Sequence, residues 1–201
     1  MNLFQILVSG GWLMVFIVIA SLVVIALGIG RFLTIRKSEQ ALVKFVARWK
    51  NSTSASDPEA FTSASKTTCH ITRDMVAVFD RQPSERLDAV EAIEAAGRQN
   101  LFQLETGLGT IATLAAATPL VGFLGTVTGM IRAFMQIQQL GGNVNANVLA
   151  GGIWEALVTT AAGLAVGIIA LVVHNYLAGR IRNVARLIET TGEITLRTLW
   201  R

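Results

Sequence analysis

The sequence predicts an all-α membrane protein with three transmembrane helices and long cytoplasmic helical extensions. Hydrophobic residues make up 52% of the 201 residues and the mean hydropathy is +0.54, whereas ordinary soluble domains are about 45–50% apolar. Three stretches, residues 1–30, 106–131 and 156–179, contain no Asp, Glu, Lys or Arg. Each stretch is longer than the roughly 20 residues that a helix needs to cross a bilayer.

The basic residues beside these stretches predict the orientation of the chain. They follow the first span, precede the second and follow the third: Arg31, Arg36, Lys37, Lys44, Arg48, Arg98, Arg180, Arg182 and Arg186. Because basic residues gather on the cytoplasmic side of membrane proteins, we expect a periplasmic N-terminus and a cytoplasmic C-terminus. Their position at span ends, rather than on one face with interleaved aromatic residues, argues against a nucleic-acid partner.

Six elements are expected along the chain. They are transmembrane helix 1 at 1–30, a cytoplasmic helical region at 31–105, transmembrane helix 2 at 106–137, a periplasmic loop at 138–147, transmembrane helix 3 at 148–177 and a cytoplasmic C-terminal helix at 178–201. The first span is expected to be a retained anchor, because it is much longer than the apolar core of about 7–15 residues in a cleaved signal peptide.

Local signals refine the cytoplasmic region. Apolar residues at near-helical spacing extend the first helix to about Trp49. The sequence Asp57-Pro58-Glu59 is typical of a helix start, and it predicts a helix over residues 58–79. Ser84 is the expected cap of the next helix, which should run unbroken into the second span.

Glu155 is the candidate ion-carrying residue, because it lies about two turns into the third span. Burying a carboxylate in a membrane costs about 2.5–3.5 kcal/mol on insertion scales, so such a residue usually faces the bundle interior or water. A carboxyl group there could take up and release a proton. The alternative is that Glu155 reaches the outer interface or pairs with Arg132, which could also guard the outer mouth or extend to lipid headgroups.

Hydroxyl groups near Glu155 are candidate members of a proton pathway. Thr159 lies one turn after Glu155 on the same face, whereas Thr160 is rotated away by about 140°. The second span contributes Thr110, Thr113, Thr118, Thr126 and Thr128. Hydroxyls can bind a carboxyl and order water without adding charge. Alternatively, they bond to the backbone of their own or a neighbouring helix.

Small residues in the second and third spans predict close helix packing, within or between subunits. These residues are Gly122, Gly125, Gly129, Gly163 and Gly167, and their spacing includes two GxxxG pairs. Pro119 lies inside the second span, where it should kink or loosen the helix.

Motifs of common enzymes are missing from the sequence, including the P-loop, HExxH, paired CxxC and the nucleophile elbow. Cys69 is the only cysteine and is expected to be an inert thiol. His70 and His174 are the only histidines, and His174 is expected at the membrane interface, with a proton relay as the less favoured alternative. We therefore expect no enzyme activity, no cofactor and no metal site.

Two runs of sequence carry a family resemblance. ATPLVGFLGTVTGM at 117–130 and GIWEALVTTAAGL at 152–164 together resemble the signature of the MotA/TolQ/ExbB proton-channel family. The resemblance covers about residues 104–177, and three expected spans favour the ExbB/TolQ branch over MotA. By position, Glu155, Thr126 and Thr160 match the polar residues important in that family, so the resemblance favours Thr160 where face geometry favours Thr159.

The resemblance implies a proton-driven motor. Its members form a homo-oligomer, usually a pentamer, whose second and third spans line a pore around the single-span helices of an ExbD/TolR-type partner. A TonB/TolA-type protein would then carry force across the periplasm to outer-membrane transport. A TolQ-type role in maintaining the cell envelope, a non-conducting scaffold and an independent ion channel are the alternatives.

Overall fold

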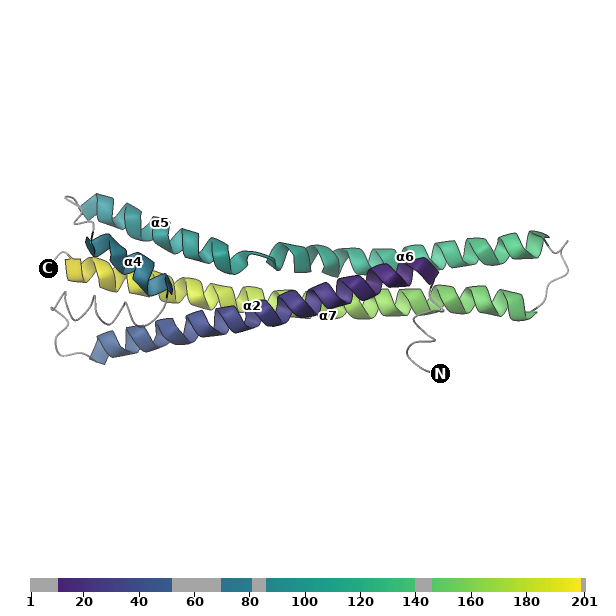
Figure 1. The fold of residues 1–201 in the computed structure, drawn as a ribbon, viewed down its shortest axis with the longest axis horizontal. Helices are drawn as coiled ribbons and strands as arrows, with labels where there is room; N and C mark the ends of the chain where they lie inside the picture. The colour runs from purple at the N-terminus through teal and green to yellow at the C-terminus, as the bar shows by residue number, and fades with distance from the viewer. Residues whose placement is uncertain (1–10, 52–69, 81–85, 140–145, 200–201) are drawn as a thin grey trace. The chain divides into compact units, whose positions relative to one another are not determined.

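The computed structural model describes residues 11–51, 70–80, 86–139 and 146–199 (Figure 1). These residues form five helices: α2 Gly11–Asn51, α4 His70–Asp80, α5 Arg86–Glu105, α6 Leu108–Gln139 and α7 Ala146–Leu199. Within the described residues, three runs of helix are long and apolar enough to cross a membrane, namely Gly11–Ala47, Arg86–Gln139 and Ala150–Arg197. The prediction of an all-α membrane protein with three spans is confirmed at this level.

The chain divides into two compact units of different chemistry. The apolar unit comprises residues 1–28 and 107–175, and the charged unit comprises residues 29–106 and 176–201. Arg132 and Glu155 are the only Asp, Glu, Lys or Arg residues of the apolar unit. Both α2 and α7 contribute residues to each unit.

In the apolar unit, α2 packs through a stripe of hydrophobic side chains. The buried members recur every one to four residues: Leu13, Met14, Ile17, Ala20 and Val24. This spacing places them on one side of a helix. The stripe ends at Gly28, where an added Cβ would lie 3.1 Å from Val173 Cγ1 of α7.

The contact between α6 and α7 uses small residues instead. We call this contact the α6–α7 seam; it contains Thr118, Pro119, Gly122, Gly125, Gly129 and Ala133 of α6 and Gly152, Ala156, Thr159, Gly163 and Gly167 of α7. A Cβ added at Gly163 would lie 2.6 Å from the Thr118 carbonyl oxygen and 2.9 Å from Gly122 Cα. The two backbones therefore approach so closely that glycine is required at this position.

Pro119 lies within α6, which continues through it from Leu108 to Gln139. Proline has no N–H, so the carbonyl of Ala115, four residues earlier, loses its helical partner. A Cβ added at Gly167 would lie 2.5 Å from Pro119 Cγ and 3.1 Å from the Ala115 oxygen. Gly167 thus leaves room for both the proline ring and the freed carbonyl.

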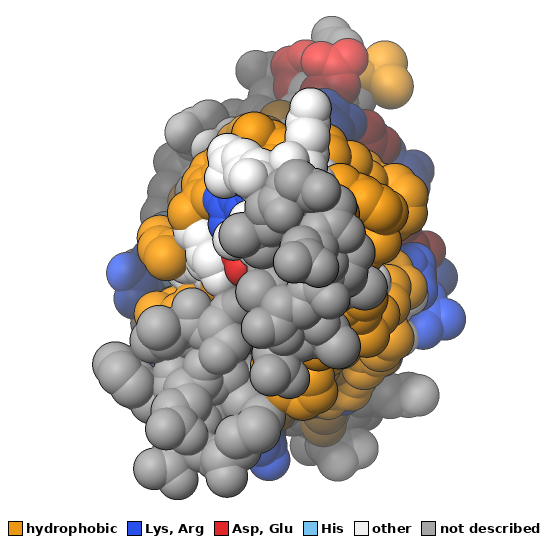
Figure 2. Space-filling view, turned by 90° about the vertical axis from the view of Figure 1, so that its right-hand side faces the viewer, with side chains coloured by type: hydrophobic (Ala, Val, Ile, Leu, Met, Phe, Trp, Pro, Cys, Tyr) orange, Lys and Arg blue, Asp and Glu red, His pale blue; other side chains and the backbone are white. Residues whose placement is uncertain are grey.

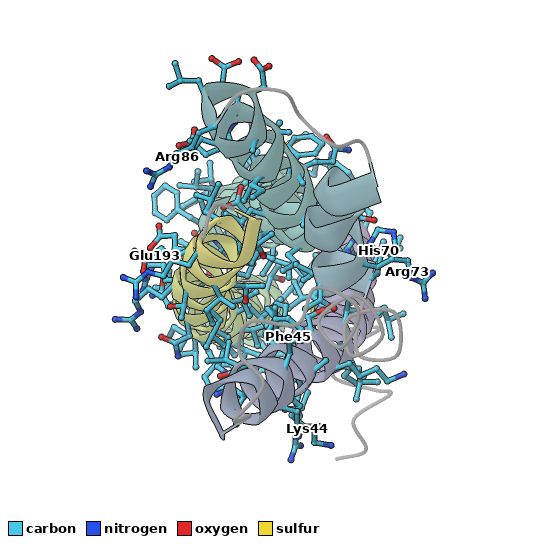
Figure 3. All side chains as sticks on the ribbon, turned by 90° about the vertical axis from the view of Figure 1, so that its left-hand side faces the viewer. Lys44, Phe45, His70, Arg73, Arg86 and Glu193 are labelled. Carbon is cyan, nitrogen blue, oxygen red and sulfur yellow. The ribbon has the colours of Figure 1, made fainter. Side chains whose placement is uncertain are left out.

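The charged unit is a bundle of α4, α5 and the adjoining parts of α2 and α7. Its buried apolar side chains come from all four helices: Ile35, Leu42, Phe45, Ile71, Ala89, Ile93, Leu104, Leu177, Ile181, Val184 and Ile188. Phe45 points in between the helices, whereas its neighbour Lys44 points away from them (Figure 3). This alternation of buried apolar and exposed charged residues is typical of a bundle in water.

Polar contacts also connect the helices of the charged unit. Glu39 of α2 pairs with Arg180 of α7 at 3.0 Å. The buried Asn100 of α5 donates from Nδ2 to Asp74 Oδ2 of α4 at 3.2 Å. Asp74 also lies 3.2 Å from His70 Nδ1. The Glu39–Arg180 ion pair thus links α2 to α7, and the Asn100–Asp74 bond links α5 to α4, whereas His70 and Asp74 belong to the same helix.

Two predictions of helix boundaries can be compared with the structure. The extension of the first helix to about Trp49 is confirmed, since α2 ends at Asn51. The unbroken helix into the second span is wrong, because a turn at Thr106 and Gly107 separates α5 from α6. Gly107 has a φ of 84°, which interrupts a right-handed helix and is accessible mainly to glycine.

Some predictions fall on other parts of the chain. The expected helix start at 57–59, the cap at Ser84, the first ten residues of span one and the turn at 141–145 lie outside the described residues. Helix α4 covers the second half of the helix expected at 58–79.

Candidate functional site

Glu155 of α7 forms an ion pair with Arg132 of α6. Arg132 Nη1 donates to Glu155 Oε1 at 2.9 Å. The Glu155 side chain is 28% exposed and the Arg132 side chain 51% exposed. The pairing alternative considered for Glu155 is therefore the arrangement that the structure adopts, and the guanidinium of Arg132 is directed to the carboxylate.

The start of α2 completes this site. Gly11 has a φ of 67°, and a Cβ added there would collide with Glu155 Oε1 and lie 3.6 Å from Arg132 Nη1. Glycine is therefore favoured at this position both by its backbone conformation and by the space that the carboxylate occupies. Sequence reasoning missed Gly11, because its place beside Glu155 depends on how three helices pack.

The end of the apolar unit where α6 leads to α7 shows the setting of the site. Hydrophobic side chains cover much of the described surface there, and a few basic and acidic atoms are also visible (Figure 2). Large apolar side chains are exposed on all three helices of the unit, including Ile19, Leu120, Phe123, Leu157 and Ile168. Such a surface suits lipid or neighbouring subunits rather than water.

The candidate hydroxyl groups bond to backbone carbonyls. Thr159 is buried and donates to the Glu155 carbonyl at 2.8 Å. Thr126 donates to the Phe123 carbonyl at 2.6 Å within α6. Thr160 differs, because it donates across the α6–α7 seam to the Gly122 carbonyl at 2.7 Å. The hydroxyl oxygens of Thr126 and Thr160 still have acceptor capacity for water.

The ion pair and two of the hydroxyls lie on different sides of the seam. On α7, Glu155 and Thr160 are five residues apart and so point about 140° apart. On α6, Thr126 and Arg132 are six residues apart and so point about 120° apart. Glu155 faces Arg132 and the start of α2, whereas Thr160 reaches α6 beside Gly122. A single chain therefore does not bring Glu155 together with Thr126 and Thr160.

The glycines and the proline singled out in the sequence all lie in the α6–α7 seam. Gly125 faces the side chain of Thr159, where an added Cβ would come within 2.5 Å of Cγ2. At Gly129, an added Cβ would lie 3.0 Å from Ala156 Cβ. These contacts hold α7 at a fixed rotation and thereby set the direction in which Glu155 points.

The chemistry open to this site is proton exchange. Glu155 is the only carboxyl side chain of the apolar unit, and a carboxyl group can bind and release a proton. In the described part of the chain, no group of three or more His, Cys, Asp or Glu side chains could hold a metal ion. A carboxyl group within an apolar helix long enough to cross a membrane is typical of an ion pathway.

Several known proteins are similar to this chain. A putative biopolymer transport protein ExbB homolog of Methanothermobacter thermautotrophicus is 36% identical over 57% of this chain and 39% of its own length. A putative biopolymer transport protein ExbB-like 1 of Synechocystis is 43% identical over 43% of this chain and 35% of its own length. The biopolymer transport protein ExbB of Salmonella typhimurium is 39% identical over 46% of this chain and 36% of its own length. The chain thus spans less than half the length of these relatives.

A family match covers most of the chain. Residues 59–190 match the MotA/TolQ/ExbB proton channel family, and this range includes Arg132, Glu155 and the whole α6–α7 seam. The members are channel and transport components rather than enzymes. With its three span-length helices, the chain is a multi-pass protein of the cytoplasmic (inner) membrane. On this match, the chain belongs to the MotA/TolQ/ExbB proton channel family.

Proposed function

We propose that the chain is the pore-forming subunit of an inner-membrane motor driven by the proton motive force. In this proposal it acts with an ExbD-type partner and energises TonB-dependent transport across the outer membrane. Glu155 takes up a proton from the periplasmic side and releases it towards the cytoplasm. Transfer of one charge through 100 mV supplies about 2.3 kcal/mol, so several protons are needed for substantial mechanical work.

One observation carries this proposal: a single carboxyl group lies in an apolar unit whose only other charged side chain is its partner, Arg132. Membership of a proton channel family supports proton movement as its role. The relatives that match are named biopolymer transport proteins of the ExbB type, which favours the ExbB over the TolQ assignment.

The oligomer and its partners form part of the same proposal. The exposed apolar side chains of α6 and α7 would face neighbouring copies or lipid in a homopentamer, with a TonB/TolA-type protein carrying the force outward. The positive-inside pattern supports a periplasmic N-terminus and a cytoplasmic location of the charged unit. Thr126 and Thr160 would line the pore and order water along it.

The test replaces Glu155 with Gln or Ala in cells that also express the partner. We expect both variants to abolish gradient-dependent uptake through a TonB-dependent transporter, because neither side chain exchanges protons. Glu193→Gln is the matched control, since Glu193 is an exposed residue of the same helix in the charged unit (Figure 3). Copurification with the partner checks that assembly is equal.

Either outcome is informative. Loss of uptake with intact assembly and a normal Glu193→Gln variant would support a protonatable residue in the pathway. Full uptake by Glu155→Gln would contradict the motor and leave a non-conducting scaffold. Proton conduction by the chain without any partner would instead indicate an independent channel.

A further inference from the structure

Among the described residues of the apolar unit, its two charged side chains form an ion pair only with each other. From residue 1 to 28 and from 107 to 175, the sequence contains no Asp, Glu, Lys or Arg besides Arg132 and Glu155. They lie on different helices, 23 residues apart, and meet at 2.9 Å. In a unit this apolar, each charge depends on the other for neutralisation.

The ion pair keeps Glu155 away from the side of the α6–α7 seam on which the Thr126 and Thr160 hydroxyls lie. Glu155 points towards Arg132 and Gly11, while Thr160 and Thr126 lie about 140° and 120° away around their helices. Arginine has five N–H donors and no acceptor, so its bond to Oε1 requires that oxygen to accept. A protonated Oε1 cannot keep this bond in the same form, and protonation there therefore competes with the Arg132 contact.

Arg132 is also able to leave the pair. Its side chain is 51% exposed, against 28% for Glu155. It lies seven residues before the end of α6 at Gln139, so its long stem can turn outward towards that end of the helix. The Arg132 side chain therefore has space to adopt a position in which it no longer contacts Glu155.

We propose that Arg132 is a positioning residue that latches Glu155. The paired state holds the carboxylate towards the start of α2 and keeps it from delivering protons to the Thr126 and Thr160 side. Opening of the pair lets one carboxylate oxygen take up a proton and turn to that side. The latch rests on the proposed function, and it limits proton leakage through subunits that are not engaged with a partner.

The experiment measures how fast a hydrophobic carbodiimide modifies Glu155 in vesicles that contain the full chain without a partner. Carbodiimides react with the protonated carboxyl, so the rate reports release of the latch. We expect Arg132→Gln to react at least about tenfold faster, the factor that corresponds to about 1.4 kcal/mol. Passive proton flux into the same vesicles should rise in parallel.

The controls separate the latch from general damage. Arg98→Gln removes a comparable contact, the exposed Arg98–Glu94 pair at 3.1 Å in the charged unit, and should react like the wild type. Arg132→Lys keeps the charge and hence the assembly, but its ammonium reaches less far, so an intermediate rate is expected. If Arg132→Gln fails to assemble, the labelling rate of Arg132→Lys tests the proposal instead: a rate above that of the wild type supports the latch, and an equal rate contradicts it.

The failure of the latch and the failure of the proposed function are distinguishable. Wild-type labelling and flux in the assembled Arg132 variants, together with an inactive Glu155→Gln, would overturn the latch and leave the proton pathway intact. Full transport by Glu155→Gln would overturn the pathway itself. Faster labelling and greater flux in the Arg132 variants, with Arg98→Gln unchanged, would support the latch.

Discussion

The apolar and charged units bury and expose opposite kinds of side chain. In the charged unit, large residues such as Phe45 and Leu42 are buried, and most of the described charged residues are exposed. At the α6–α7 seam of the apolar unit, the buried residues are mostly glycines, and large residues such as Leu120 and Phe123 face outward. The same chain therefore uses two packing rules, one suited to water and one suited to lipid.

The difference follows from what drives association in each solvent. In water, burial of large apolar side chains stabilises a bundle by about 25 cal/mol per Å². In lipid this gain is absent, so helices associate through close backbone contact that small residues allow. An isolated ion pair such as Arg132–Glu155 is then conspicuous in the apolar unit, whereas several charged pairs are unremarkable in the charged one.

The largest effect is expected in the core of the charged unit. Phe45→Ala should destabilise this unit by about 3–5 kcal/mol, because Phe45 is 1% exposed and its removal leaves a cavity. Val43→Ala, two residues away and 48% exposed, should have little effect. Hydrogen exchange of the backbone amides of the charged unit measures the stability of both variants. Equal amide protection in Phe45→Ala and Val43→Ala would contradict the assignment of this core.

A second pair of variants tests which solvent each unit faces. Leu120 of α6 and Leu87 of α5 are 70% and 71% exposed, so only their surroundings differ. Leu120→Lys should impair membrane insertion by about 2.5–3.5 kcal/mol, whereas Leu87→Lys should be neutral. The yield of inserted chain measures this, and normal insertion of Leu120→Lys would place that surface in water.

The smallest of the three effects is expected at the seam. Gly163→Ala should cost about 1–3 kcal/mol, because the new methyl group meets backbone atoms of α6 that cannot move aside. Gly151→Ala is the control on the same helix, since nothing lies within 4 Å of its added Cβ. Thermal unfolding in detergent compares them; equal stabilities would mean that the seam is looser than described.

Much of the fold could be predicted from the sequence because hydrophobic patterns are local. The three spans and the extension of the first helix beyond the membrane follow from charge-free runs and helical spacing. The break at Gly107 could not be predicted, because several glycines are present nearby and only packing determines which one adopts a positive φ. Because the sequence on both sides of Gly107 has a helical pattern, the pattern alone predicts one continuous helix.

The candidate site was predictable in its chemistry and less so in its geometry. Glu155 stands out as a lone carboxylate, and its pairing with Arg132 was one of several open alternatives. The pair depends on the register of α6 against α7, which the seam fixes through contacts such as Gly129 with Ala156. Gly11 carries no sequence signal of its own, since its role depends on the third helix.

Proton flux into vesicles that contain the chain assembled with its partner tests the central claim most directly. Under an imposed gradient, the wild type should conduct protons above the background of empty vesicles, and Glu155→Gln should fall to that background at equal assembly. Equal flux in the two would contradict the account, because Glu155 would then not carry the protons.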